Sequence, residues 1–514
     1  MHSVKRKIFW WIVASSVVVF LALTLGFIWV ARPEALRKYI AEGLSEHLGL
    51  DANVGEVSIR LLPRPRLDAT NLTLSVPNSA HLPPFVSIDH LWVDVGLLSF
   101  ARRHVDTVYV EGLKIAVPPK SERREGGSNS RDKTDTKIVV NHLIARDAEL
   151  VFVRADPAKR PLTFLIHDLK VDDLGFDRVI PFYAKLTNPV PTGLIESRGT
   201  FGPWQRGDPG GLPISGDYTF TDADLSTING IGGTLSSVGK YEGHLSEISV
   251  TGETDTPNFS LELGGKPVPL KTKFQAIVDG TNGTTELVRV DAKMRNTAII
   301  TKGAITNLEG PGRHDIKLHV RIEDGRIEDV LALAIDSPKP MLVGDLSLES
   351  TLALPPGKTK VPQRLAMNGR FGLGRAEFTD AQLQEKLQEL SRRSQGKDED
   401  ERIGRVLTDL RGRFAIQSGV LKLPDLTFRV PGASVALAGT YQLEKGEIDF
   451  AGTLRMQASV SRAVGGFKSI FLRPFDRLFR KDGAGAVVPI KITGTREHPD
   501  MSLQIGKVFK GGKD

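Results

Sequence analysis

Residues that could carry chemistry are scattered along this chain. The eleven histidines form no H-E-x-x-H motif, and the sequence contains neither a G-x-S-x-G nucleophile motif nor a Walker phosphate loop. His314 and His319 are five residues apart in a stretch with strand-like alternation, and an odd spacing on a strand places them on opposite faces. They are therefore poor joint metal ligands. Ser, Thr and Asp are abundant, so a triad assembled from distant strands stays open, but no motif points to one and we predict no catalytic, metal or cofactor-binding residue.

The densest acidic group also lacks the spacing of a binding site. Its members, at 168, 172, 173 and 177, fit no EF-hand, and we interpret them as a solvated loop. Gly372-Leu-Gly374 lacks the rest of a dinucleotide fingerprint and is interpreted as turn glycines. The chain has no cysteine, which excludes disulfides, thiol catalysis and cysteine–zinc sites.

The composition favours a β protein with a mild positive charge. The 514 residues carry a net charge of +7 and a pI near 9.3. This charge suits the neighbourhood of an anionic membrane but is too diffuse to indicate nucleic-acid binding. The 51 glycines and 30 prolines, with only 7% aromatic residues, predict short strands broken by turns.

The N-terminal stretch Ile8–Ala31 carries no charged residue and is long enough to cross a bilayer core of about 30 Å. A basic cluster precedes it, and indoles flank it, as at membrane interfaces. These flanking residues are Lys5, Arg6, Lys7, Trp10 and Trp11. We predict an uncleaved transmembrane anchor at 8–31 with a cytoplasmic tail at 1–7 and the remainder across the membrane; a cleaved signal peptide and a buried core helix are the alternatives.

A first module is expected at 32–119. Its opening segment, Pro33–Leu50, has helical spacing of apolar residues and is expected to lie at the membrane or to cap the following sheet. Strand patterns begin near Asn53 and continue to Val117. In the last of them, Val105, Tyr109, Leu113 and Ile115 are predicted by the two-residue period to share one face.

The middle of the chain is expected to be one long sheet. Residues 120–137 contain no aliphatic or aromatic side chain, which predicts a disordered linker, with a charged recognition segment as the alternative. From 138 to 379 strands and turns dominate, with clear alternation at Ile316–Ile322 and Leu346–Leu354. A glycine followed two residues later by a bulky apolar residue recurs, as in Gly303-Ala-Ile305 and Gly439-Thr-Tyr441. Many similar strands joined by short turns indicate a meandering sheet rather than separate globules.

Helical patterns return near the C-terminus. A helical insertion is predicted at 380–411, first at Asp380–Ser394 and then resuming at Ile403–Leu410. Strands follow in a C-terminal region, 412–514. Within it, the segment 459–480 interleaves basic residues with apolar ones, including Phe467, Phe471, Phe475 and Phe479. This pattern is typical of an interfacial membrane helix; a helix that plugs the end of a sheet is the alternative.

Short strand-and-turn spacings at the two ends of the chain carry a family resemblance. At the N-terminal end they follow the expected transmembrane helix and the segment after it, and they are Gly55-Glu-Val-Ser-Ile59, Leu62-Pro63, Asn71-Leu-Thr-Leu74 and Val105-x6-Gly112-Leu-x-Ile115. At the C-terminal end they are Phe414-Ala-Ile-x2-Gly419-Val-Leu, Leu437-x-Gly439-Thr-Tyr and Val488-Pro-Ile-Lys-Ile-Thr-Gly494. With these motifs the chain resembles the AsmA family of bacterial envelope proteins. The resemblance covers about half of the chain, and the middle matches only in style.

The resemblance implies a fold and a function. The fold is mainly β: an N-terminal transmembrane helix, then a long, curved, mostly antiparallel β-sheet groove, with short amphipathic helices near both ends. The family is similar in architecture to chorein-type lipid-transfer proteins and TamB, which implies that phospholipid acyl chains lie along the groove. An open apolar face needs a cover, and lipid tails are a suitable one. The expected groove residues are Val105, Tyr109, Leu113, Ile115, Ile316, Leu318 and Val320.

The expected function is therefore non-enzymatic. The protein would be anchored in the bacterial inner membrane and would conduct phospholipids through the periplasm towards the outer membrane. It would contact the inner membrane through the basic and aromatic residues near 5–11 and 467–479, with no nucleic-acid partner. The alternative is an assembly factor or scaffold for outer-membrane proteins that holds partner strands at exposed sheet edges. An anchored cell-wall hydrolase would need convergent carboxylates or a metal, and a purely structural sandwich would carry no ligand.

Overall fold

The structure is a computed structural model of the 514-residue chain. It describes residues 33–48, 50–60, 66–77, 83–94, 104–117, 139–153, 161–175, 178–203, 209–262, 264–308, 314–357, 359–397, 404–457, 486–495 and 498–503. The predicted anchor at 8–31, the linker at 120–137 and the basic apolar segment at 459–480 lie outside these residues. In the part of the chain that the structure describes, no helix combines the length and the apolarity needed to cross a membrane.

The protein is mainly β, as predicted. The described residues form 26 strands, and nearly all pairs of neighbouring strands are antiparallel. By its contacts the chain divides into two compact units, which differ from the predicted modules. Unit 1 is Met1–Pro189, Leu194–Thr219 and Lys240–Ile248, and unit 2 is Val190–Gly193, Phe220–Gly239 and Ser249–Asp514.

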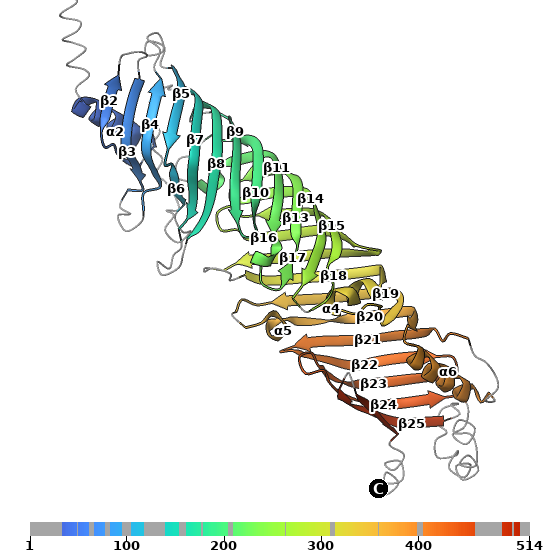
Figure 1. The fold of residues 1–514 in the computed structure, drawn as a ribbon. Coiled ribbons are helices and arrows are strands. Elements are labelled where there is room, and N and C mark those ends of the chain that lie inside the picture. Colours follow the sequence, from blue (N-terminus) through green and yellow to red (C-terminus); the bar gives the residue numbers. More distant parts are fainter. Residues whose placement is uncertain are drawn as a thin grey trace, which may run out of the picture. The chain divides into compact units, whose positions relative to one another are not determined.

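Unit 1 begins with the helix α2 (Pro33–Leu48), which confirms the helix predicted there. Its strands are β1 (Asp51–Asn53), β2 (Val57–Arg60), β3 (Arg66–Ser75), β4 (Val86–Asp94), β5 (His104–Glu111), β6 (Lys114–Val117), β7 (Val139–Phe152), β8 (Leu162–Leu174) and β9 (Ile180–Pro189). β1 and β2 both pair with β3, and β3 pairs with β4. β4 pairs with β5 and β6, and both of these run parallel to β7, which pairs with β8 (Figure 1).

Two glycines interrupt strands of unit 1. Gly55 separates β1 from β2, and a Cβ there would lie 2.8 Å from the carbonyl oxygen of Thr70. Gly112 separates β5 from β6 with a φ of +64°, a conformation that glycine adopts without the strain of a Cβ. The alternation of side chains is therefore not continuous from β5 to β6.

Four strands contribute residues to both units. They are β10 (Thr192–Phe201), β11 (Pro213–Asp224), β13 (Thr234–His244) and β14 (Glu247–Leu261). The short helix η2 (Pro209–Gly211) belongs to unit 1, whereas η3 (Leu225–Thr227) and β12 (Ile231–Gly232) belong to unit 2.

Unit 2 continues as an antiparallel meander in which each strand from β15 pairs with the next. Its strands are β15 (Val268–Val278), β16 (Thr285–Met294), β17 (Thr297–Asn307), β18 (His314–Arg326), β19 (Leu342–Leu354), β20 (Ala366–Phe378), β21 (Thr408–Gln417), β22 (Val420–Val430), β23 (Ala433–Gln442), β24 (Glu447–Met456), β25 (Ala486–Thr495) and β26 (Pro499–Leu503). Its helices are α4 (Ile327–Ala334), α5 (Val361–Arg364) and α6 (Ala381–Gln395).

The predicted helical insertion is half right. Its first part is α6, but its second part is wrong, because residues 404–407 are not helical and β21 begins at Thr408. Here Val406 and Thr408 are buried while Leu407 and Asp409 are exposed, which is the two-residue period of a strand. The helix α4, in a stretch predicted to be strand and turn, was not expected.

Candidate functional site

One side of the unit 2 sheet is apolar across many strands. On β18, Ile316, Leu318 and Val320 share one side, as predicted, while Lys317 and Arg321 are exposed on the other. The residues in register with these three in β19 are Leu354, Leu352 and Ser350. The same side continues through Met367 and Phe371 of β20, Ile416 of β21, Leu421 and Leu426 of β22, Leu437 and Tyr441 of β23, Ile448 and Phe450 of β24, and Ile490 and Ile492 of β25. We call this side of β17–β25 the apolar face.

The opposite side of the same strands is charged. Arg370 donates to Glu349 on the neighbouring strand at 2.5 Å and lowers the pKa of that carboxyl group. Asp425 accepts from the backbone N–H of Arg413 at 2.8 Å and from its guanidinium at 2.5 Å, and both bonds lower its pKa. Because each charge on this side has water beside it, these pairs contribute little to stability but keep this side polar.

Glycines lie in the apolar face opposite large side chains. Gly369 faces Phe414 and Gly412 faces Phe371 across β20 and β21. The arrangement recurs in β23 and β24, where Gly439 faces Phe450 and Leu437 faces Gly452. The recurrent spacing of glycine and bulky residue in the sequence therefore places both on one face, with each large side chain beside the glycine of its neighbour.

Glycine is required at these positions for a steric reason. A Cβ at Gly412 would lie 2.6 Å from the carbonyl oxygen of Asp425 and 3.2 Å from the ring of Phe371. A Cβ at Gly439 would overlap the carbonyl oxygen of Asp449, and one at Gly452 that of Ala436. A Cβ at these positions would meet the backbone of the next strand, so glycine permits the close approach of the two strands.

Away from α4 and α6, much of the apolar face is only half-buried. Leu318, Leu352, Met367, Ile416 and Leu421 are all of intermediate exposure, although each has apolar neighbours in the sheet. In a sheet packed against a second layer, such residues would be fully buried. Within the described residues, the fully buried clusters of unit 2 lie instead near one end of the strands, where α4 and α6 pack.

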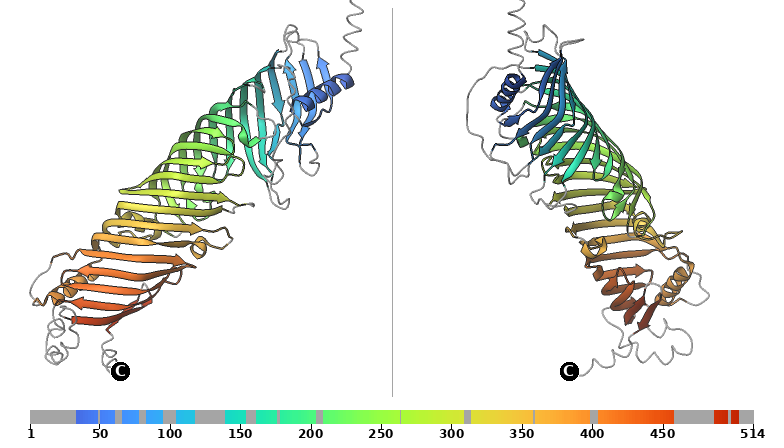
Figure 2. Two further views of the ribbon diagram at one scale, coloured as in Figure 1. Left: turned by 180° about the vertical axis from the view of Figure 1, so that it is seen from behind. Right: turned by 60° about the vertical axis from the view of Figure 1, so that its left-hand side comes forward.

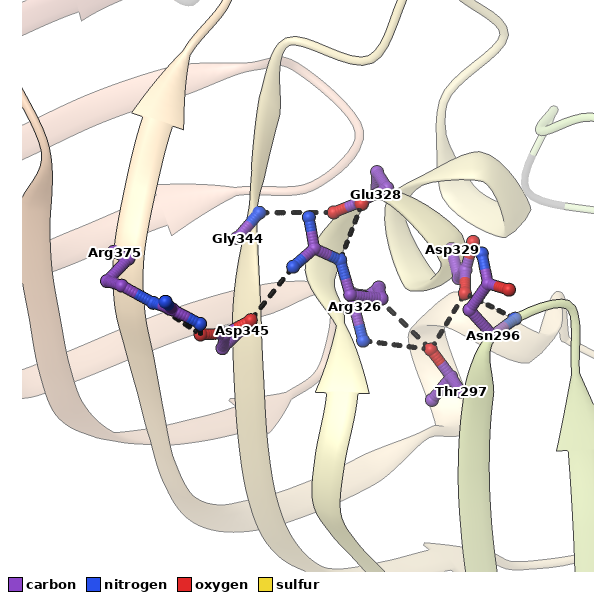
Figure 3. Close-up of polar contacts among 8 residues, drawn as sticks. All are labelled: Asn296, Thr297, Arg326, Glu328, Asp329, Gly344, Asp345 and Arg375. Carbon is purple, nitrogen blue, oxygen red and sulfur yellow. Dashed lines mark hydrogen bonds and ion pairs between the residues drawn. The ribbon is translucent and has the colours of Figure 1, made fainter. Parts of the chain in front are cut away.

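A polar network fixes α4 at that end of the sheet (Figure 3). Asp329 of α4 is 2% exposed and accepts hydrogen bonds from the backbone N–H of Asn296 at 3.0 Å and the hydroxyl of Thr297 at 2.9 Å. Arg326 donates to Glu328 and to Asp345, each at 2.8 Å, and Glu328 also accepts from the backbone N–H of Gly344 at 3.1 Å.

The same helix closes an apolar cluster. Ile327 and Val330 of α4 pack against Ile322, Leu346 and Leu373 of the sheet. The buried polar groups of α4 are paired and its apolar side chains are packed, so α4 is stably docked at one end of the apolar face, on β18 and β19.

The helix α6 covers the same end of the strands further along the sheet. Leu387 and Leu390 pack with Phe428 and Leu454, which belong to β22 and β24. Figure 2 shows α6 on one side of the layer formed by these strands.

The predicted residues of unit 1 lie in a different environment. Leu113 is buried in a cluster with Val108, Val110 and Ala145, and Ile115 packs against it. Tyr109 is not on that side: its ring stacks on Trp92 at 5.3 Å, opposite Val108 and Val110 along the strand. The predicted shared face is therefore wrong for Tyr109, because Gly112 interrupts the alternation between β5 and β6. The side chain of Val105 is not among the described ones.

The acidic group expected in a loop lies in a strand instead. Asp168, Asp172 and Asp173 are all in β8. The Oδ2 atom of Asp168 lies 3.6 Å from the ammonium of Lys170. The Oδ1 atom of Asp172 is hydrogen-bonded to Nδ1 of His142 at 2.8 Å. In the described ranges, no group of three or more histidines and carboxylates could hold a metal ion.

Two clefts that the sequence did not indicate lie on the charged side of unit 2. One, of about 910 Å³, has Ser347, Gly372 and Arg411 in its lining. The other, of about 820 Å³, has Ala304, Ala353 and Lys302 in its lining. Each cleft has a pair of small residues in register in its lining, Ser347 with Gly372 in the first and Ala353 with Ala366 in the second, and this pairing appears only once the register is known.

Comparison of the chain with protein-family models, with curated proteins and with solved structures finds no match.

Proposed function

We propose that this protein binds phospholipids, with their acyl chains on the apolar face of unit 2, and supports their transfer between the inner and outer membranes of a bacterial envelope. The observation that carries the proposal is the apolar surface across β18–β24, which is largely half-exposed away from α4 and α6 and has charged groups on the other side of the same strands. The resemblance of the sequence ends to the AsmA family supports the same reading.

The dimensions of the face suit acyl chains. Along β18 the apolar side chains from Ile316 to Ile322 extend about 20 Å at ~3.3 Å per residue. One leaflet of a bilayer core is about 15 Å thick, so an acyl chain fits along a strand. Across the sheet, eight strands from β18 to β25 extend over about 34 Å at ~4.8 Å per strand, which leaves room for more than one lipid.

The energetics favour such an occupant. Each methylene transferred from water contributes about 0.8 kcal/mol, and the Leu, Ile and Phe side chains of the face lose water at the same time. A polar headgroup stays in water at the margin of the face. No bond is made or broken, so the proposed function is binding and transfer rather than catalysis.

The test uses the alternation of β18 as its own control. A photoreactive benzoyl-phenylalanine replaces Leu318 or Leu352 on the apolar face, or Lys317 or Thr351 on the charged side, in the full-length chain in cell envelopes. After irradiation, mass spectrometry is expected to find phospholipid adducts at the first pair and not at the second. Polypeptide adducts at Leu318 and Leu352 without lipid would overturn the proposal and favour the assembly-factor alternative.

A further inference from the structure

The helix α6 occupies surface that belongs to the apolar face. Phe428 and Leu454, against which it packs, are in one row of the sheet with Val435 and Leu410. Leu387 and Leu390 of the helix therefore sit where the apolar face would otherwise continue to the end of its strands. The outward residues Glu385, Lys386 and Glu389 are exposed, as in a helix that is apolar on one side only.

Besides the packing of its leucines, α6 is held by polar contacts, and most of these are long. Gln384 exchanges hydrogen bonds with the backbone of Val406 at 3.3 and 3.4 Å, and Gln388 donates to the carbonyl of Gly404 at 3.3 Å. A single short bond joins the hydroxyl of Ser391 to the carbonyl of Pro431 at 2.7 Å.

One buried group weakens the fit further. The hydroxyl of Ser394 is fully buried and finds no hydrogen-bond partner among the described residues. A buried hydroxyl without a partner costs free energy relative to one in water. By contrast, α4 docks on the same sheet with its buried Asp329 and Thr297 paired at 2.9 Å.

We propose that α6 is a displaceable cover over one part of the lipid-binding face, and that phospholipid acyl chains replace its leucines on Phe428 and Leu454. This inference rests on the proposed function and adds a regulated part to the same surface. Acyl chains and the leucines of α6 compete for the same apolar contacts, and the long polar bonds of the helix add little to its side of that competition.

Hydrogen exchange measured by mass spectrometry tests the cover directly. The full-length protein is compared without lipid and with diheptanoyl-phosphatidylcholine added below its micelle concentration, with binding measured in parallel. Amides of α6 are expected to exchange faster when the lipid binds, while those of α4, the internal control, stay unchanged. If lipid binds and α6 exchange does not change, the cover is overturned and the proposed function stands; if no lipid binds, both fall.

Two substitutions in α6 should change its hydrogen-exchange rate in opposite directions in the lipid-free protein. Ser391→Ala removes the bond to Pro431 and is expected to speed exchange of α6 about two- to tenfold, whereas Ser394→Ala removes a buried unpaired hydroxyl and is expected to slow it. Equal effects of the two would contradict the inference. Exposed Glu385→Ala is the control.

A covalent cross-link that holds α6 on the sheet tests the effect of the helix on lipid binding. Because the chain has no cysteine, Gln395→Cys and Pro431→Cys, two positions joined by a 3.4 Å hydrogen bond, can be linked by a short bismaleimide. The linked protein is expected to bind less lipid than the same variant before linking. Unchanged lipid binding after complete linking would overturn the cover.

Discussion

The two units use the same alternation of apolar and polar residues with opposite results. In unit 1 the apolar side is closed: Ala145 and Ala148 are 0% and 1% exposed, and α2 places Leu36, Ile40 and Leu44 on the cluster next to them. In unit 2 much of the apolar face is half-exposed, and among the described residues α4 and α6 pack on it near one end of the strands.

The difference lies in how the side chains pack. The buried residues of unit 1 are mostly small or branched, such as Val110 and Ala145, and larger ones such as Leu143 are partly buried around them. Unit 2 combines large side chains with glycines, such as Phe371 beside Gly412, and the glycines let neighbouring backbones approach closely. An alternating strand therefore predicts an apolar side, but the packing of other elements on it decides whether that side is a core or a surface.

The largest effect is expected where unit 1 is closed. Val110 is 2% exposed, so Val110→Asp buries a charge without a partner and should lower the free energy of unfolding by about 3–5 kcal/mol. Denaturant unfolding measures this loss. Val288→Asp, on a side chain that is exposed in unit 2, is the control and should change stability by less than about 0.5 kcal/mol. Similar losses for both would break the comparison.

A smaller effect is expected at the glycines where neighbouring strands of unit 2 approach closely. Gly439→Val places a side chain against the carbonyl of Asp449 and the ring of Phe450, and overpacking of this kind costs about 1–3 kcal/mol. Gly404 has no heavy atom within 4 Å of an added Cβ, so Gly404→Val is the matched control. The two melting temperatures should separate clearly, and equal values would contradict the close packing at Gly439.

The open face should tolerate charge better than the core. Leu318→Asp leaves a carboxylate with access to water, so the lipid-free protein should lose about 1 kcal/mol or less. Its lipid content should fall strongly, because acyl chains cannot cover a charge. Lys302→Asp, on the charged side of the adjacent strand, should leave lipid content unchanged, and a similar loss there would argue that net charge, not the face, governs binding.

The smallest effect concerns the ion pairs of the charged side. The hydrogen bond from Arg375 lowers the pKa of Asp345 in the folded protein, so its contribution to stability is present above the unfolded pKa and is lost as the pH falls through the folded value. Arg375→Ala should therefore be slightly less stable near pH 7 and indistinguishable from the parent chain well below pH ~4. Melting curves at both pH values check this, and a difference that grows in acid would contradict it.

The sequence predicted those features that depend on local spacing. The strand β18, with Ile316, Leu318 and Val320 on one side, follows from the two-residue period, and α2 follows from helical spacing after Pro33. The helix α4 could not be predicted in this way, because its buried Asp329 is stabilised by Asn296 and Thr297, which are over thirty residues away. The pairing of Gly412 with Phe371 likewise needs the register between strands.

Sequence spacing misplaced Tyr109 for a related reason. A two-residue period holds only while the strand is continuous, and Gly112 breaks it where a Cβ would overlap the carboxylate of Asp89. The membrane anchor predicted at 8–31 and the helix predicted at 459–480 lie outside the described residues and stay predictions.

The most direct test of an open, lipid-binding face in unit 2 is the phospholipid content of the full-length protein, purified gently and measured by native mass spectrometry. It is compared with the double variant Leu318→Asp and Leu352→Asp, purified in the same way, so that lipid held elsewhere on the chain is subtracted. The account predicts at least one phospholipid per chain that the variant lacks while its fold, followed by circular dichroism, is retained. Equal lipid content in two folded proteins would contradict it.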